Sequence, residues 1–242
     1  MNTLPAQIFL EVEYNTLISI IIPVFNNEDC IGDCLTHVVA YGLGAEIIIV
    51  DGGSEDSTVA IAQEYPVRIF GCRNGRSAQM NYGASKATRD ILYFLDPETT
   101  PPVTFVEDIY SSLLQGNLGG CFKLRFVDGP WLTELNWYMA RFKIRCSGGG
   151  DQSLFLFAHT FEELGGYDES LEIMLDFDLV DRLRKSGKFD VITNEIHVRS
   201  QKYRSISYLK VQLANVFVYQ MFRLGYSQEV LKSTWSRMLD RP

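Results

Sequence analysis

Four carboxylate side chains follow apolar, strand-like runs in the first hundred residues. They are Glu28, Asp51, Asp96 and Glu98. In an open parallel α/β sheet, ligands bind in the crevice at the carboxyl ends of the strands, so these side chains are expected to converge on one site. Carboxylate oxygens suit a hard divalent cation, and the crevice suits a nucleotide. The spacing therefore predicts a site for a nucleotide and a metal ion.

Short strands alternating with helices must position these groups. We predict strands at residues 18–24, 46–50, 67–70 and 91–95, and helices at 28–40, 57–64, 77–87 and 103–114. Longer elements follow, with strands at 121–127 and 153–157 and helices at 131–142, 174–185 and 208–224. Repeated strand and helix pairs predict one α/β domain with a Rossmann-like, mostly parallel central sheet flanked by helices, and C-terminal helices after it.

Four strings in this order, PVFNNE, VDGGSEDST, GRSAQMNYGA and FLDPE, resemble the family 2 glycosyltransferases of the GT-A fold. These enzymes move a sugar from a nucleotide donor to an acceptor. Residues 73–83 and 150–152 are most similar to a bacterial subgroup of small, single-domain enzymes. The resemblance runs from about residue 18 to residue 202. It implies a nucleotide-sugar donor, which we expect to be UDP-linked.

The resemblance implies that Asp96 and Glu98 form the metal motif of the family, with Mg²⁺ or Mn²⁺ as the ion. The second position is usually Asp in the subgroup, so Glu98 departs from it by one methylene. An isolated Asp-Pro-Glu after a strand would be read as a solvated turn bent by Pro97. The three upstream strings favour the metal.

The family also implies a set of donor-binding residues. They are Pro23, Phe25, Glu28, Asp51, Arg76, Asn81, Asp96, Asp151 and Lys202. Asp51 would accept a hydrogen bond from the base or ribose, and Arg76 and Asn81 would face the sugar or the diphosphate. For Arg73, a surface salt bridge is as good an explanation as a contact with the donor. Gln152 would shape the pocket, and Arg204 is a second basic candidate beside Lys202.

Inverting transfer needs a general base that deprotonates the acceptor hydroxyl. The family supplies the Asp of a Glu-Asp pair at a helix start, and the residues in this place are Leu175 and Asp176. The resemblance therefore implies Asp176 as the base, with Asp178 in reserve. The missing glutamate puts acceptor binding or rate in doubt, and an Asp at a helix start is also commonly a cap.

The composition restricts the partners and the compartment. A net charge of −8 and a pI near 5.0 argue against a broad nucleic-acid-binding surface. Five cysteines without paired metal-ligand spacing, and no leading signal segment, favour the cytoplasm. Cys30 and Cys34 would share one helix face as buried free thiols.

We divide the chain into an N-terminal extension (1–17), a glycosyltransferase domain (18–203) and a C-terminal helical segment (204–242). The apolar helix at 208–224 needs a cover. It packs on the domain or across a homodimer in one interpretation. In the other it makes peripheral contact with the inner face of the membrane and meets a lipid-linked acceptor.

Two other functions compete with sugar transfer. A nucleotide-binding pseudoenzyme or assembly partner of the same fold is suggested by Leu175 and Glu98. A dehydrogenase is disfavoured, because no Gly-X-Gly-X-X-Gly follows the first strand.

Overall fold

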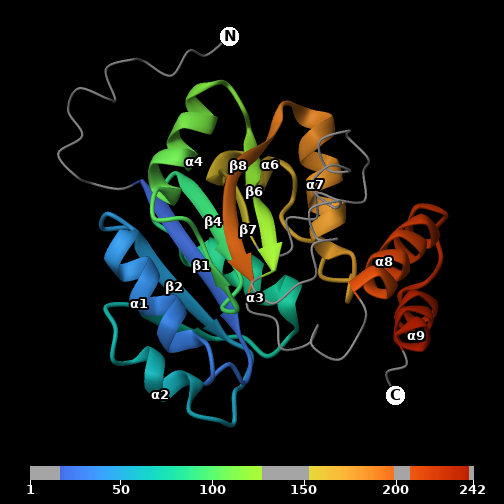
Figure 1. Ribbon diagram of the computed structural model, residues 1–242, viewed down its shortest axis with the longest axis horizontal. Coiled ribbons are helices and arrows are strands. Elements are labelled where there is room, and N and C mark those ends of the chain that lie inside the picture. Colours follow the sequence, from blue (N-terminus) through green and yellow to red (C-terminus); the bar gives the residue numbers. More distant parts are fainter. Residues whose placement is uncertain (1–16, 127–152, 199–207, 240–242) are drawn as a thin grey trace.

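Strands and helices alternate through the chain in the computed structural model, which describes residues 17–126, 153–198 and 208–239 (Figure 1). The first described part contains β1 (Ile18–Val24), α1 (Ile31–Tyr41), β2 (Glu46–Asp51), α2 (Thr58–Ala62), β3 (Arg68–Gly71), α3 (Arg76–Lys86), β4 (Ile91–Leu95), β5 (Thr99–Thr100), α4 (Phe105–Leu114) and β6 (Gly119–Phe126). The remainder contains β7 (Ser153–Phe157), α6 (Ala158–Glu163), α7 (Leu175–Ser186), β8 (Phe189–Val198), α8 (Tyr208–Arg223) and α9 (Gln228–Met238).

The described strands form one eight-stranded sheet in the order β3-β2-β1-β4-β7-β6-β8-β5. The first four strands in this order are mutually parallel. β7 runs antiparallel to both β4 and β6, while β6 and β8 are parallel to each other. The predicted α/β fold with a mostly parallel central sheet is therefore confirmed.

Both faces of the sheet are covered, which explains the continuous burial of the central strands. One face packs against α1, α2 and α4 through alternate side chains such as Ile20 and Ile49. The opposite face packs against α3, α6 and α7 through side chains such as Ile21 and Leu156. Every residue of β1 and β4 is buried, as expected for strands with helices on both sides.

α3 lies unusually close to the sheet. A Cβ placed on Gly83 would come within 2.5 Å of Ile21 Cγ2 and 3.0 Å of Val50 Cγ2. Only a glycine allows this approach, so Gly83 fixes how closely the helix sits over β1 and β2. The beginning of α3 is thereby set over the carboxyl ends of those strands.

Most predicted elements are present with ends shifted by a few residues. The predicted helix at 131–142 and residues 1–16 lie outside the described residues. Four additional elements, β5, α6, β8 and α9, were not indicated by the sequence pattern. In the described part of the chain, no helix is long and apolar enough to cross a membrane.

Candidate functional site at the carboxyl edge of the sheet

The predicted strand ends lie at one edge of the sheet. Val24, the last residue of β1, pairs with Asp51, the last residue of β2. β4 pairs with β1 on its other side and ends at Leu95, so Asp96 leaves the sheet at the same edge. The parallel register therefore brings the carboxylates of Asp51 and Asp96 to the same side of the domain.

The loops that follow β1 and β2 are joined by reciprocal hydrogen bonds. The Asn26 amide N–H donates to Ser54 Oγ at 2.9 Å, and the Glu55 N–H donates back to Asn26 Oδ1 at 2.9 Å. The Asn27 N–H donates to Thr58 Oγ1 at 2.7 Å. Asn26 adopts the left-handed conformation, with φ of 52°, that Asn tolerates better than most residues. The two loops consequently form one ordered surface.

Glu28 belongs to this loop framework. Its Oε2 accepts a hydrogen bond from the Ser57 N–H at 2.9 Å, and its own N–H donates to Asp56 Oδ2 at 3.1 Å. The Glu28 carboxylate thus satisfies the N–H at the start of α2. A direct contact between Glu28 and a nucleoside stays a prediction.

Pro23 and Phe25 flank the end of β1 in different environments. Pro23 is buried in the strand, whereas the Phe25 ring is 58% exposed. A Cβ on Gly52 would lie 3.4 Å from Phe25 Cδ2, which places the ring over the first residue of the second loop. Phe25 therefore offers an exposed aromatic surface beside Asp51.

Asp51 organises the turn that follows β2. Its carboxylate accepts hydrogen bonds from the Gly53 N–H at 3.0 Å and from the Ser54 N–H at 3.0 Å. Gly53 has a φ of 98°, and a Cβ there would lie 2.7 Å from Arg73 Nε. The positive φ favours glycine at this position, and a larger residue would also have to displace the Arg73 side chain. Oδ2 accepts from both N–H groups, whereas Oδ1 accepts only from Ser54, so Asp51 can still receive a ligand hydroxyl at Oδ1.

Gln79 is a positioning residue that the sequence interpretation missed. Its buried Nε2 donates to the carbonyl oxygens of Val24 at 3.1 Å and Val50 at 2.8 Å. One side chain of α3 therefore ties the last residue of β1 to the next-to-last residue of β2. A glutamine between Ala78 and Met80, in a helix face that meets the core, was the available signal.

Asp96 lies in a tight turn and pairs with Arg76. Its Oδ1 accepts the Glu98 N–H at 2.9 Å, which holds the Asp-Pro-Glu segment in a bend. Its Oδ2 lies 3.2 Å from Arg76 Nη2, and Arg76 is the first residue of α3. Both side chains are partly exposed, at 32% for Arg76 and 19% for Asp96. A guanidinium and a carboxylate are thus both accessible at this edge.

The pKa of the Cys30 thiol is raised in part by the negative charge of this turn. Burial, followed by the nearby carboxylates of Glu98 and Asp96, raises the pKa of Cys30 to about 11. The thiol therefore stays protonated. Glu98 and Asp96 act on the same neighbour, so their charges lie close together next to the start of α1.

Asp176 is buried at the beginning of α7, only 6% exposed. Burial raises the pKa of this carboxyl, the Arg76 guanidinium and the Tyr167 hydroxyl lower it, and the charge of Asp96 raises it. Its Oδ1 has no hydrogen-bond partner among the described residues. Met174, the N-cap of α7, has a φ of 66°, a strained conformation for this residue type. The chain therefore brings Asp176 into the electrostatic environment of Arg76 and Asp96.

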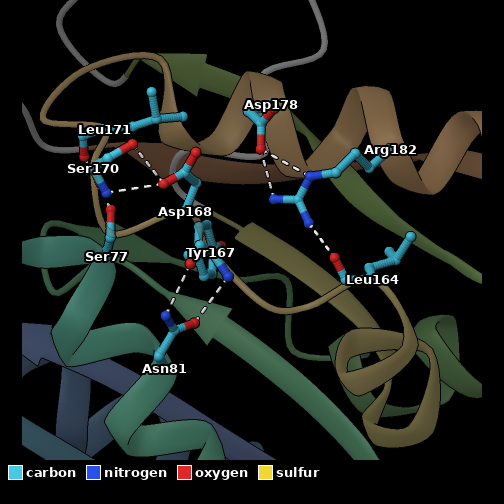
Figure 2. A network of polar contacts seen from close by, with 9 residues as sticks. All are labelled: Ser77, Asn81, Leu164, Tyr167, Asp168, Ser170, Leu171, Asp178 and Arg182. Atoms are coloured by element: carbon cyan, nitrogen blue, oxygen red, sulfur yellow. Dashed lines mark hydrogen bonds and ion pairs between the residues drawn. The ribbon is translucent and has the colours of Figure 1, made fainter. Parts of the chain in front are cut away.

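Leu175 and Asp178 differ in environment from Asp176. Leu175 is buried in the apolar cluster beneath α7. Asp178 Oδ2 accepts hydrogen bonds from Arg182 Nε at 2.8 Å and Nη2 at 2.6 Å, one helical turn along (Figure 2). The role of Asp178 as a reserve base stays a prediction, and its Oδ2 is already engaged by both Arg182 nitrogens.

Asn81 is a clamp between α3 and the segment before α7 (Figure 2). Its Nδ2 donates to the Tyr167 carbonyl at 2.9 Å and to Glu169 Oε1 at 2.9 Å, and its Oδ1 accepts the Tyr167 N–H at 2.8 Å. Both amide hydrogens and the carbonyl are in use. A contact between Asn81 and the donor stays a prediction, and the clamp gives this side chain a structural role.

A second contact from α3 supports the same segment. Ser77 Oγ donates to the Leu171 carbonyl at 3.1 Å, and Arg182 Nη1 donates from α7 to the Leu164 carbonyl at 2.6 Å (Figure 2). Residues 164–171 are thus held from both sides. The remaining predicted residues, Asp151, Gln152, Lys202 and Arg204, lie outside the described part of the chain.

The sequence matches the profile described as "Glycosyl transferase family 2" over residues 19–159. It is 31% identical over 130 residues to "Glycosyltransferase AglE" of Haloferax volcanii, covering 48% of this chain and 43% of that protein. The chain spans less than half the length of this curated relative.

Solved structures share the fold at low sequence identity. A mannosyltransferase from Pyrobaculum calidifontis in complex with GDP-Man and Mn²⁺ has a TM-score of 0.66 and 16% identity, covering 93% of this chain and 70% of that chain. Glucosyl-3-phosphoglycerate synthase from Mycobacterium tuberculosis in complex with Mg²⁺ and UDP has a TM-score of 0.59 and 18% identity, covering 93% and 80%. These similarities confirm the predicted GT-A architecture.

Proposed function

The chain belongs to glycosyltransferase family 2, and we propose that it transfers a sugar from a UDP-linked donor to an acceptor hydroxyl with inversion at the anomeric carbon. The observation that carries the proposal is the convergence of three charged side chains at the carboxyl edge of the sheet. Arg76 pairs with Asp96, and both influence the pKa of the buried Asp176. Arg76 and Asp96 can hold a diphosphate together with a metal ion, and Asp176 can take a proton from the acceptor hydroxyl.

The nucleoside would lie on the joined loops after β1 and β2. The exposed Phe25 ring offers a surface on which a base can stack. Asp51, fixed by two loop N–H groups, would accept a hydrogen bond from the base or the ribose. Structures in complex with UDP and with GDP-Man are known for two proteins of this fold, which supports a nucleoside diphosphate as the ligand class.

The acidic turn fits a divalent metal that is shared with a diphosphate. No cluster of three or more potential ligands occurs in the described residues, but Mg²⁺ is usually held by one or two carboxylates together with substrate phosphates. Asp96 and Glu98 are hard oxygen ligands of this kind, and the charges of both carboxylates raise the pKa of the nearby Cys30 thiol. A bound Mg²⁺ or Mn²⁺ would neutralise charge on the leaving diphosphate. Arg76 would add a second positive charge there.

Asp176 has the properties of a general base. Burial makes its carboxylate more basic than a solvated one, and Oδ1 is available to accept a proton from an acceptor hydroxyl. The α3 clamp on residues 164–171 fixes the approach to α7 and therefore the position of this carboxylate. A nucleotide-binding pseudoenzyme remains the second candidate, because Leu175 is buried and brings no polar group to the acceptor.

A ligand panel followed by a donor-hydrolysis assay tests the proposal. UDP sugars with Mn²⁺ should raise the melting temperature, and Asp96→Ala should remove the metal dependence of that shift. Asp176→Asn should leave UDP binding intact and lower transfer by about 100-fold or more. Asp178→Asn, two positions along the same helix turn, is the matched control and should retain transfer.

The outcomes separate the candidates. UDP binding without donor hydrolysis or transfer to any acceptor would favour the pseudoenzyme. Retention of the anomeric configuration, seen by NMR of the product, would overturn the inverting mechanism. Equal turnover of Asp176→Asn and wild type would remove Asp176 as the base.

A further inference from the structure

The C-terminal helices α8 and α9 form a hairpin that contacts the chain on both sides of Asp176. Trp235 Nε1 donates to Asn215 Oδ1 at 2.9 Å, which joins the two helices to each other. Both helices lie beside α7 in Figure 1. α9 binds the segment just before α7, and α8 binds the first turns of α7 itself. The last elements of the chain are therefore attached next to the proposed base.

Gln228, the first residue of α9, holds the segment before α7 by its backbone. Its Oε1 accepts the N–H of Glu172 and the N–H of Ile173, both at 3.1 Å. An amide oxygen has two lone pairs, so both acceptor positions of this atom are used. The Gln228 side chain is half-buried. One side chain thus fixes two consecutive residues that lie outside any helix or strand.

The held segment leads directly into a strained residue. Met174, the N-cap of α7, has a φ of 66° and a ψ of 11°, a left-handed conformation that persists in a methionine only when its surroundings impose it. The Met174 carbonyl accepts the Asp178 N–H at 3.0 Å, within the first turn of α7. Gln228 holds the two residues before Met174, and α7 holds the residues after it. Together they impose the turn that delivers Asp176 to its place.

α8 fixes the chain on the other side of Asp176. The ring of Phe177, the next residue, packs against Tyr219 with the ring centroids 5.3 Å apart. The Tyr219 hydroxyl donates to Asp181 Oδ2 at 2.9 Å, and Arg223 Nη1 donates to the same oxygen at 3.0 Å. Tyr219 is buried, so these contacts are a packed part of the fold. The hairpin therefore holds the backbone both before and after the proposed base.

Asp176 depends on its backbone for its position. The side chain is buried, and its Oδ1 has no hydrogen-bond partner among the described residues that would hold it in place. A general base must meet the acceptor hydroxyl at hydrogen-bond distance, and a misplacement of about 1 Å can cost about 100-fold in rate. The contacts that fix residues 172–174 therefore bear on the rate of transfer.

We propose that Gln228 is a positioning residue for the general base, acting through the backbone of residues 172–174 on Asp176. The inference rests on the proposed function and extends it, because it makes the α8–α9 hairpin a structural part of the catalytic centre. Lys232 gives a comparison on the same helix, one turn from Gln228. It pairs with the side chain of Glu172, and both of these side chains are 60% exposed. The same segment is thus contacted once through its backbone and once through a solvated side chain.

Hydrolysis of a UDP sugar with Mn²⁺ tests the proposal, with water in the place of the acceptor hydroxyl. The sugar is the one that raises the melting temperature most. Gln228→Met keeps the length of the side chain but lacks the amide oxygen, so kcat should fall by about tenfold or more. The KM for the donor and the affinity for UDP should stay at their wild-type values, because the loops after β1 and β2 are unchanged. Gln228→Glu keeps an acceptor oxygen and should restore most of the rate.

Two further variants distinguish positioning from a general loss of structure. Lys232→Met removes only the exposed ion pair with Glu172 and should keep the wild-type kcat. The double variant Asp176→Asn/Gln228→Met should be no slower than Asp176→Asn alone, because a residue that acts through the base has no effect once the base is gone. Two independent defects would instead multiply.

Amide hydrogen exchange gives a readout that needs no turnover. The N–H groups of Glu172 and Ile173 should exchange faster in Gln228→Met than in the wild type, and Gln228→Glu should restore their protection. Unchanged exchange at these two groups would overturn the role of Gln228 alone. A wild type that hydrolyses no donor would count against the proposed function instead.

The kinetic results can also overturn the proposal while the proposed function stands. This is the case if Asp176→Asn is slow and Gln228→Met has the kcat of the wild type. Multiplied losses in the double variant would equally show that Gln228 does not act through Asp176.

Discussion

Replacing Asn81 by alanine separates a clamp from a ligand contact. The variant removes the amide that pairs with both backbone groups of Tyr167, at 2.8 and 2.9 Å. Tyr167 is 2% exposed, so its N–H and carbonyl would lose partners in a largely dry environment. At about 1 kcal/mol for each lost hydrogen bond, the free energy of unfolding should fall by about 2 kcal/mol. The bond to Glu169 is exposed and should add little.

A loss of this size is measurable in a chain of 242 residues. Each kcal/mol corresponds to about 2–4 °C in a protein of this length, so the melting temperature should fall by about 4–8 °C. Ser85→Ala, on the same helix, removes only a hydrogen bond to the neighbouring Tyr82 carbonyl and should change stability by less than about 0.5 kcal/mol. Both measurements use thermal unfolding without ligand.

Calorimetry with UDP and Mn²⁺ supplies the second half of the experiment. Asn81 has no spare amide hydrogen, so Asn81→Ala should bind UDP with the affinity of the wild type. A variant that melts like the wild type but binds UDP about tenfold more weakly, a difference of about 1.4 kcal/mol, would refute the clamp and restore the donor contact.

Three further perturbations follow from the structure. The pKa of Asp176 is higher in the folded protein than its ordinary value of 3.8 in the unfolded chain. Between these two pKa values the folded protein holds a proton that the unfolded chain has released. The free energy of unfolding therefore falls as the pH rises through this range. Asp176→Asn should therefore melt increasingly above the wild type as the pH rises above about 4, and a pH-independent difference would contradict the raised pKa. Gly83→Ala should cost about 1–3 kcal/mol in chemical denaturation, since its Cβ meets Ile21 at 2.5 Å, and wild-type stability would show that α3 can move away. Asp51→Ala should free the Gly53 and Ser54 N–H groups and weaken UDP binding in calorimetry, while unchanged affinity would remove the proposed pocket.

The repeated strand and helix pattern of the first half could be predicted, because buried parallel strands read as unbroken apolar runs. β8 could not. Ile192 pairs with Phe122 and Glu195 with Lys123, so Thr193 and Asn194 are extra residues in a bulge. The bulge breaks the alternation on which strand prediction depends, and the partner strand is far away in sequence. α6 was missed because it begins directly after β7 without turn residues between them.

Residue types at the site were easier to predict than their partners. The strand-end position of Asp51 and Asp96 follows from parallel topology, which local sequence indicates. The hydrogen bonds of Asn81 and Asp178 cannot be predicted from local sequence, because they depend on where the fold places residues 164–171 and Arg182. The burial of Asp176 depends in the same way on the packing of α7 against the sheet.

The clamp from α3 has a consequence for how this fold can diverge. Asn81 and Ser77 bind the backbone atoms of Tyr167 and Leu171, and no side-chain atom of either residue takes part in these bonds. Backbone partners are supplied by any residue that keeps the same chain path. The exposed side chains at residues 168–170 can therefore be exchanged over evolutionary time while α7 keeps its distance from α3, whereas Gly166, whose Cβ would meet Asn81 Oδ1 at 2.7 Å, and the buried Tyr167 are constrained. This exposed surface can change without rebuilding the edge of the sheet that carries Asp51 and Asp96.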